Sequence, residues 1–480
     1  MLRCRGHAAR PDVFRVVPVG QALVVEEQPG RPVDPDRLYD TLSALVRKHQ
    51  VPGAQLAIHH GGETVALEVG ELEYGSGCRV TRDAAFPIGS VCKSFTATLV
   101  MILVADGDLE LDAPVGEYLP ELGDLGDQLT LRQVLSHTSG FASDPDSDEV
   151  STATLRRYVL DHCHRENLVL PPGAGFSYSN MGYVLAGHLI ETITGMGWSE
   201  AMESILLRPL RIDPAFVAVP GLEPPRRPIA TGHSVNPVVG RTRPVDQSLA
   251  PAEAPAGALA MSAVDLVSLG LIHVGQGVPE LLPVTYAEQM RQAVPAADPF
   301  GLADGWGSGL AVFRKGVTDW VGHDGNGDGT SCYLRVDPVG GWAVAFTSNS
   351  NTGVYLWQEL LAELADTSIP IGRPRAWVAQ GQPTAPPPDC VGTYVNGDVE
   401  YVVAERDGRL HLVDGDAFDR LTFYDGLTFS LQDPASGQQV LGGRFLRHPV
   451  TEEINGIQIG GRLACPRIDL ANEAEQKLTA

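Results

Sequence analysis

The sequence predicts an α+β fold, in which helices pack on an antiparallel sheet, followed by a separate all-β domain. Two observations predict the first part: a helical stretch at 38–49 leads into a hairpin-like pair of apolar runs, and apolar strands follow one another over 306–347. A third observation predicts the second part, because the pattern changes after the proline-rich stretch 374–388 to short strands about ten residues apart.

The composition is that of an ordinary globular protein. The chain has 480 residues, of which 43% are hydrophobic and 20% charged, enough for a large core and for more than one domain. The formal net charge is −24 and the chain has no basic tract. Neither nucleic acid nor an anionic membrane is therefore expected as a partner.

The cysteines and the N-terminal residues indicate the compartment. Seven cysteines are scattered along the chain without a Cys-x-x-Cys pair, which favours free thiols in a reducing compartment. The N-terminus is basic but is not followed by an apolar segment, so no signal peptide is expected. The longest apolar run, 99–105, is too short to span a bilayer. We therefore expect a cytoplasmic protein.

The first elements combine a helix with a hairpin. In chain order, the sequence predicts a strand at 22–25, an amphipathic helix at 38–49, and strands at 55–59 and 64–69. Gly61 and Gly62 separate the last two strands, as is typical of a hairpin turn.

A second helix is predicted to begin at Ser90. Pro87 and Gly89 precede a run of good helix formers, and Gly107 follows it. Ser90 and Lys93 are three residues apart, so in a helix they share one face, where the unpaired N–H groups of the first turn favour a developing negative charge. A lysine there can draw or accept the serine proton. A nucleophile beside an activating group is the minimum that acyl transfer through a serine ester requires. A serine helix cap beside a solvated lysine is the alternative.

The next helix is predicted to begin with Thr130 as its cap and to end at His137. His137 could be catalytic. A histidine at a helix end beside Ser-Gly is more often structural, with its side chain hydrogen-bonded to the loop, and we favour that interpretation.

A polar turn at 171–180 precedes a further predicted helix at 181–190. Tyr178 and Asn180 are two apart, so both can face one cleft from an extended turn. A tyrosine phenol near a lysine can shuttle protons, and an asparagine amide can hold a substrate carbonyl. Ordinary turn chemistry is the alternative.

The segment 219–257 is crowded with proline and is interpreted as a long excursion that could wall or cover a site. A helix follows at 261–274 with Ser262 as its cap. The apolar runs 306–312, 320–334 and 342–347 are interpreted as three successive strands of an antiparallel meander. Strands after the linker are predicted at 400–403, 410–413, 421–424, 428–431, 443–446 and 456–459.

Two metal patterns are rejected. The run from Asp324 to Gly329 matches the first half of an EF-hand loop, but its twelfth position is Arg335 and its flanks are strand-like. The group around His162 and Cys163 has no distant Cys or His pair to complete a zinc site. No metal and no cofactor are expected.

Three motifs occur in order along the chain: Ser-Val-Cys-Lys at Ser90, Tyr-Ser-Asn at Tyr178, and His-Asp-Gly at His323. Together with the neighbouring text at 86–90, 135–140 and 255–257, they resemble the superfamily of serine β-lactamases and penicillin-binding proteins. The resemblance is greatest to class C β-lactamases, DD-carboxypeptidases and related esterases, and covers roughly residues 35–360.

The resemblance implies roles for these residues. Ser90 would be the nucleophile, Lys93 its activator and Tyr178 the general base, while Asn180 would contact the substrate amide. The backbone N–H groups of Ser90 and Asn326 would form the oxyanion hole.

The third motif departs from the usual Lys-Thr-Gly of the family, because His323, Asp324 and Gly325 stand in its place. Histidine occurs there in several peptidase, esterase and acyltransferase branches. A carboxylate at Asp324 would repel a substrate carboxylate, so ordinary penicillin recognition is not expected.

The resemblance also implies a domain plan. A β-lactamase-like domain, with an antiparallel sheet, flanking helices and an all-helical subdomain, would span 34–372. An N-terminal extension (1–33) would precede it, and a linker (373–389) would lead to a β-barrel at 390–480. The barrel resembles the lipocalin-like domain of some peptidases of this superfamily and of the penicillin-binding-protein-type thioesterases, which cyclise or transfer peptides in antibiotic biosynthesis.

Three functions are open at this stage. The first is a hydrolase that cleaves an amide or ester of a small-molecule or peptide acyl substrate through acyl-Ser90. The second is a transacylase or peptide cyclase of secondary metabolism, which passes the acyl group to an amine acceptor. The third is a non-catalytic binding protein on the same fold, which the presence of Ser90, Lys93 and Tyr178 disfavours.

Overall fold

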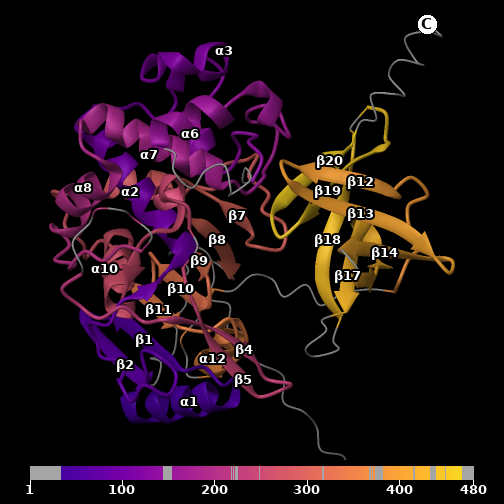
Figure 1. Cartoon of the computed structure of the whole chain (residues 1–480). Helices are drawn as coiled ribbons and strands as arrows, with labels where there is room; N and C mark the ends of the chain where they lie inside the picture. Colours follow the sequence, from indigo (N-terminus) through magenta and orange to yellow (C-terminus); the bar gives the residue numbers. More distant parts are fainter. Residues whose placement is uncertain are drawn as a thin grey trace, which may run out of the picture.

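The computed structural model forms a larger body and a smaller C-terminal domain (Figure 1). It describes residues 34–467 apart from 144–153, 218, 220, 222–224, 248, 316–317, 367–368, 370, 373–381, 415–416, 433–438 and 449. The strand predicted at 22–25 and most of the predicted linker lie outside the described residues. The larger body is named here the first domain.

The first domain is built on an antiparallel sheet, which the described residues form in the order β2-β1-β11-β10-β9-β8-β7. Its strands are β1 (Gly53–His60), β2 (Glu63–Gly70), β7 (Gly305–Trp306), β8 (Ala311–Lys315), β9 (Thr318–Gly327), β10 (Thr330–Asp337) and β11 (Trp342–Ser348). Short pairs form beside it: β3 (Phe86–Pro87) with β6 (Ala260–Met261), and β4 (Gly232–Asn236) with β5 (Arg241–Val245).

Helices cover both faces of this sheet. α1 (Pro35–Lys48) and α12 (Gly353–Asp366) lie on one face and α10 (Ala263–His273) on the other (Figure 1). Side chains of β11 alternate between the two layers: Val344 and Phe346 join the cluster under α1 and α12, whereas Ala343 and Ala345 join the cluster under α10.

A helical subdomain adjoins the sheet. Its helices are η1 (Gly89–Val91), α2 (Cys92–Asp106), η2 (Val115–Glu117), η3 (Pro120–Leu122), α3 (Gly123–Gly126), α4 (Leu131–Leu135), α6 (Leu155–His162), η4 (Arg165–Asn167), α7 (Asn180–Thr194), α8 (Trp198–Ala201) and the π-helix η5 (Met202–Leu207). The remaining helices of the first domain are η6 (Pro251–Glu253), α9 (Ala254–Gly257) and α11 (Val284–Arg291). The helix starts predicted at Thr130 and Ser262 are confirmed, since both residues form capping boxes.

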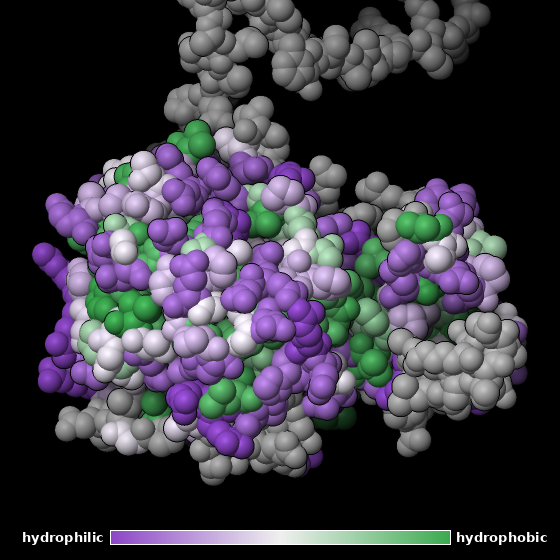
Figure 2. Space-filling view, turned by 90° about the horizontal axis from the view of Figure 1, so that it is seen from above, coloured by the Kyte–Doolittle hydropathy of each residue, from purple (hydrophilic) through white to green (hydrophobic). Residues whose placement is uncertain are grey.

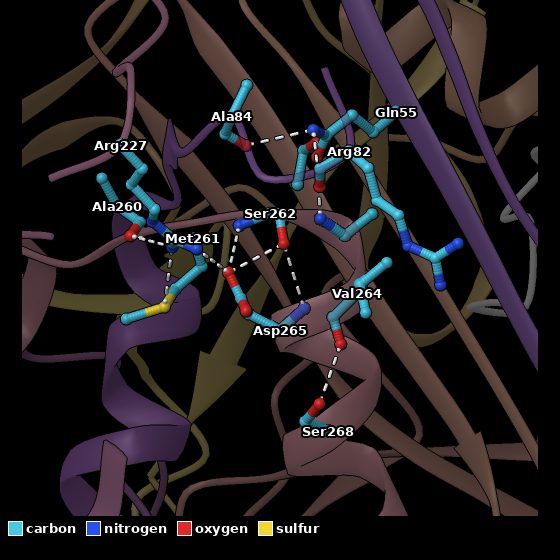
Figure 3. A network of polar contacts seen from close by, with 12 residues as sticks. Gln55, Arg82, Ala84, Arg227, Ala260, Met261, Ser262, Val264, Asp265 and Ser268 are labelled. Carbon is cyan, nitrogen blue, oxygen red and sulfur yellow. Dashed lines mark hydrogen bonds and ion pairs between the residues drawn. The ribbon is translucent and has the colours of Figure 1, made fainter. Parts of the chain in front are cut away.

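A buried polar network fixes the segment that precedes α10 (Figure 3). The Arg227 guanidinium pairs with the Asp265 carboxylate at 2.6 Å and donates to the Ala260 carbonyl at 3.2 Å. Asp265 also accepts a hydrogen bond from the N–H of Ser262, and the side-chain amide of Gln55 in β1 donates to the Ala84 carbonyl. The network therefore holds β3, β6 and the start of α10 together, next to the segment that carries Ser90.

The C-terminal domain is a nearly closed antiparallel barrel, whose described strands have the order β15-β14-β13-β12-β20-β19-β18-β17-β16. They are β12 (Gly392–Asn396), β13 (Val399–Arg406), β14 (Arg409–Asp414), β15 (Ala417–Arg420), β16 (Thr422–Phe423), β17 (Thr428–Gln432), β18 (Gln439–Arg447), β19 (Ile454–Ile459) and β20 (Arg462–Pro466), with a 3₁₀ turn η7 (Asp425–Leu427). Aromatic side chains such as Phe423, Phe429 and Phe445 fill its interior.

The fold class predicted from the sequence is confirmed, but the strand count is not. The run 306–312 was predicted as one strand and forms two, because the backbone turns at Ser308 and Gly309 and pairs Trp306 with Ala311. The run 320–334 likewise forms the hairpin of β9 and β10, whose turn lies at Gly329. Strands β3, β4, β5, β6, β12, β15 and β20 were not predicted.

The helical stretch Gly89–Asp106 is longer than its apolar run suggested, and by length and composition alone it could cross a membrane. Within the structure, 72% of it is buried, as in the core helix of a globular domain. The six cysteines of the described part of the chain are free, four of them buried.

Candidate active site

Ser90 lies in η1, which runs directly into α2. Two glycines let strand β9 approach this turn closely. Gly89 has φ +50°, and a Cβ there would overlap the carbonyl group of Asn326. A Cβ on Gly325 would overlap the carbonyl of Ile88. Only glycine fits this contact at both positions, so the sequence places the third motif against Ser90.

Lys93 is buried one turn after Ser90. Its ammonium group donates to Ser90 Oγ at 3.0 Å and to the Ala256 carbonyl at 3.1 Å. It also lies 5.1 Å from the centre of the Tyr178 ring. A lysine that donates to Oγ supplies positive charge where the serine alkoxide would form, which leaves proton removal to another group.

Tyr178 lies in the loop that precedes α7, and only 8% of it is exposed. Its backbone N–H donates to the carbonyl of Gly461 in the C-terminal domain at 3.0 Å. Asn180 is the first residue of α7, and its N–H donates to the Ser143 carbonyl at 2.9 Å. The spacing predicted that both side chains can face one cleft, but only Tyr178 is among the residues that line the cavity beside Ser90.

His137 is buried and holds this loop. Its carbonyl accepts the N–H of Ser177 at 3.0 Å, its Nδ1 accepts the N–H of Ser179 at 3.1 Å, and its ring lies against that of Tyr178 with centroids 4.2 Å apart. Burial first, and then the charge of Lys93, holds the pKa of His137 well below its usual value. The side chain is neutral and hydrogen-bonded to the loop, as favoured from the sequence.

His323 is buried in β9 and has a defined tautomer. Its Nδ1 lies 2.7 Å from the Asp324 carbonyl oxygen, which can only accept, so Nδ1 carries the proton and Nε2 presents a lone pair. Burial first, and then the charge of Lys93, lowers the pKa of His323 to about 3. At neutral pH this position therefore offers an acceptor where the family's usual lysine would offer a cation.

Asp324 is paired with a buried arginine. Arg335 of β10, whose side chain is 1% exposed, donates to the Asp324 carboxylate, which is 39% exposed. The same guanidinium donates to the Gly372 carbonyl at 3.2 Å and stacks on the Phe313 ring at 3.8 Å. The charge of Asp324 is thus offset from inside the protein while its outer edge remains accessible.

A cavity of about 280 Å³ brings these groups together. Among the predicted residues, it is lined by Ser90, Tyr178, His323, Asp324 and Asn326. Three predicted residues, Lys93, Asn180 and Gly325, are not among the lining residues. Lys93 contacts the cavity through its hydrogen bond to Ser90, and Gly325 packs against the turn that carries Ser90.

Sequence reasoning missed two sets of lining residues. Leu302, Trp306 and Phe313 supply an apolar wall. Gly460 and Arg462 come from the β19–β20 hairpin of the C-terminal domain, and the Arg462 guanidinium lies 5.6 Å from the centre of the Tyr178 ring. The glycine pair at 460–461 signals a turn, but nothing in the sequence indicates that this turn reaches Ser90. Apolar surface follows the junction of the two bodies (Figure 2).

Other hollows lack this chemistry. One of about 810 Å³ lies beside Phe216, and one of about 370 Å³ lies against Phe423 of the barrel, and neither is lined by Ser90 or Tyr178. Among the described residues, no group of three or more His, Cys, Asp or Glu side chains could hold a metal ion.

Known proteins resemble this chain over most of its length. A family model described as Beta-lactamase matches residues 18–366. Penicillin-binding protein 4 of Amycolatopsis lactamdurans is 33% identical over 357 residues, which cover 71% of this chain and 92% of that protein. The unguisins hydrolase of Aspergillus campestris is 27% identical over 366 residues, covering 72% of this chain and 67% of that protein.

Among solved structures, that of SurE is similar over both domains. It has 38% sequence identity and a TM-score of 0.81, and the match covers 90% of this chain and 99% of that chain. A second structure of SurE, with D-Leu, has a TM-score of 0.79.

Proposed function

Because the chain belongs to the beta-lactamase family, we propose that it is a serine acyl-enzyme catalyst that cleaves an amide or ester through acyl-Ser90. One observation carries the proposal: the buried Lys93 ammonium donates to Ser90 Oγ at the wall of a cavity that Tyr178 also lines. A nucleophile, a cation and a phenol in one cavity are the groups that acyl transfer needs.

These positions support the following acylation step. In this step Tyr178, as its phenolate, takes the Ser90 proton while the Lys93 ammonium stabilises the serine oxygen, and Oγ forms a bond to the substrate carbonyl carbon. The backbone N–H groups of Ser90 and Asn326 receive the developing oxyanion. The bond to the leaving group then breaks, and that group leaves with the proton held by the Tyr178 network.

The polar groups of the cavity favour a peptide-like substrate. Arg462 adds a positive charge and Asp324 a partly exposed carboxylate, which suit a carbonyl and an N–H or ammonium group respectively. His323 is neutral, so position 323 lacks the cation with which a lysine there would bind a substrate carboxylate. The structure of SurE with D-Leu supports a residue of D configuration as the substrate's acyl group.

Hydrolysis is the function that we favour, because relatives such as the unguisins hydrolase are hydrolases. Transfer to an amine is the second candidate. The apolar wall of Leu302, Trp306 and Phe313 favours it, because apolar surface beside Ser90 limits the access of water to acyl-Ser90.

The test is intact mass spectrometry of wild type and Ser90→Ala after incubation with matched D- and L-leucyl esters and thioesters and with β-lactams. We expect a covalent adduct on wild type alone, formed faster from the D-ester. Ser90→Ala should lower turnover of the ester by on the order of 10⁴-fold or more. The lifetime of the adduct with and without added amines separates hydrolysis from transfer.

Turnover of the same ester by Ser90→Ala at the wild-type rate would refute the proposal. An amide product in the presence of amines, at the expense of free acid, would select the transferase.

A further inference from the structure

A single asparagine of the C-terminal domain connects that domain to the loop of the general base. Asn396, the last residue of β12, is fully buried. Its Oδ1 accepts the N–H of Ser143 at 2.7 Å. Its Nδ2 donates to the Leu463 carbonyl at 2.6 Å and to Ser177 Oγ at 3.2 Å. One amide group therefore binds two segments of the first domain and strand β20.

The two segments that Asn396 binds are the ones that fix Tyr178. Ser177 directly precedes the tyrosine, and its Oγ also accepts the N–H of Leu463 at 3.3 Å. Ser143 donates from its Oγ to the Tyr178 carbonyl at 3.2 Å. On the other side, the Tyr178 N–H is held by the Gly461 carbonyl, one residue before Arg462.

We propose that Asn396 is a positioning residue for Tyr178, so that the C-terminal domain is an obligatory part of the active site. The inference rests on the proposed function in one respect, the role of Tyr178 as general base. The β19–β20 hairpin supplies Gly460 and Arg462 to the cavity. Asn396 also holds this hairpin, because its amide donates to the carbonyl of Leu463, the residue after Arg462.

The Asn396 amide is sensitive to substitution because it is buried and fully hydrogen-bonded. Removing a buried amide from water costs free energy, and this cost is not offset if the amide loses its hydrogen-bond partners. The contacts of Asn396 therefore favour one relative position of the two domains. A general base works only within hydrogen-bond reach of the proton that it removes, and a shift of about 1 Å can cost on the order of 100-fold in rate. Small movements at Asn396 should therefore appear as large losses of acylation.

The decisive variant is Asn396→Asp, which keeps the shape of the side chain and the acceptor for Ser143. Its second oxygen cannot donate to the Leu463 carbonyl or to Ser177 Oγ. Ser177→Ala removes one of these contacts from the other domain. Thr428→Ala is the matched control, because its buried hydroxyl donates at 3.0 Å to the Asp425 carbonyl within the barrel alone.

Two readouts separate positioning from catalysis. The first is amide hydrogen exchange of a peptide covering 176–181, which we expect to be faster in Asn396→Asp and Ser177→Ala but unchanged in Thr428→Ala. The second is the acylation burst with p-nitrophenyl acetate between pH 6 and 10. We expect it to fall by about 30- to 100-fold in Asn396→Asp, with a changed pH profile. Because this variant buries a carboxylate against a carbonyl oxygen, its melting temperature should fall below that of the control, and the burst is measured well below that temperature.

A double variant provides the final check. Since Asn396→Asp and Ser177→Ala remove the same contact, their losses should not multiply when combined. The inference would be overturned if amide hydrogen exchange of the 176–181 peptide in either single variant were as slow as in wild type. An acylation rate of Asn396→Asp within twofold of wild type would also overturn it. Absence of any acyl-Ser90 in wild type would instead refute the proposed function, while the exchange data would still decide whether Asn396 positions the loop.

Discussion

The two halves of the active site are held in different ways. Ser90 and Lys93 belong to one helical turn, and their side chains meet because residues three apart share a helix face. Tyr178 lies in a loop whose N–H groups are held by His137 and Gly461, from two distant parts of the chain. A local motif can therefore specify the proposed nucleophile, whereas the position of the proposed base depends on tertiary structure.

The largest effect is expected from a substitution beside Ser90, the proposed nucleophile. In Gly89→Ala, a side chain would have to adopt φ +50° and displace the backbone of β9 at Asn326. We expect the free energy of unfolding to fall by about 3 kcal/mol, from backbone strain and overpacking together. Acylation should fall on the order of 100-fold because Ser90 moves. Urea unfolding and burst kinetics measure the two effects.

Gly107→Ala is the control at the other end of the same helix. Gly107 has φ +84°, but a Cβ there would meet open space. This variant should lose only about 1 kcal/mol to strain and keep its acylation rate. Equal losses in the two variants would contradict the role given to the contact between η1 and β9.

The same contrast explains what could be predicted from the sequence. Ser90, Lys93, Tyr178 and His323 could be identified because each belongs to a short motif. Arg335 was noticed only as a residue that argues against calcium, since its pairing with Asp324 depends on the register of β9 and β10. Strand pairing and domain contacts join residues far apart in the chain, and local periodicity carries no record of them.

The meander shows the same limit at the level of the fold. The apolar character of 306–347 predicted strands correctly, because these side chains lie in the core. It did not predict where the strands turn. Gly309 and Gly329 mark the turns through their positive φ values, which apolar periodicity alone does not reveal.

An intermediate effect concerns pH and involves both halves. Burial lowers the pKa of His323 and of His273 to about 3, and holds that of His137 well below its usual value. The unfolded chain has ordinary histidines with pKa values near 6.5, so below this pH it binds protons that the native state excludes. The free energy of unfolding should therefore fall as the pH decreases from 6.5 to 5, by roughly 1 kcal/mol per pH unit for each histidine.

His273→Gln provides the control, because His273 lies at the end of α10, away from the cavity. In this variant the free energy of unfolding should depend less steeply on pH than in wild type, by the contribution of one histidine, roughly 1 kcal/mol per pH unit. The acylation rate should be unchanged. Imidazole NMR should show His137 and His323 neutral down to pH 5. A midpoint near 6.5 for either one would contradict this prediction.

The smallest expected effect tests whether every contact between the domains matters equally. Arg444 of β18 pairs at 2.8 Å with Asp298, whose side chain is 65% exposed, and its guanidinium lies 4.6 Å from the centre of the Phe300 ring. Because the Asp298 end of this pair is exposed to water, while the Arg444 side chain is 20% exposed, Arg444→Gln should cost about 1 kcal/mol and leave acylation within twofold of wild type. Urea unfolding and the acylation burst measure both. If Arg444→Gln instead slowed acylation as much as Asn396→Asp, any loosening of the interface would displace Tyr178. The buried amide of Asn396 would then have no role beyond that of the interface as a whole.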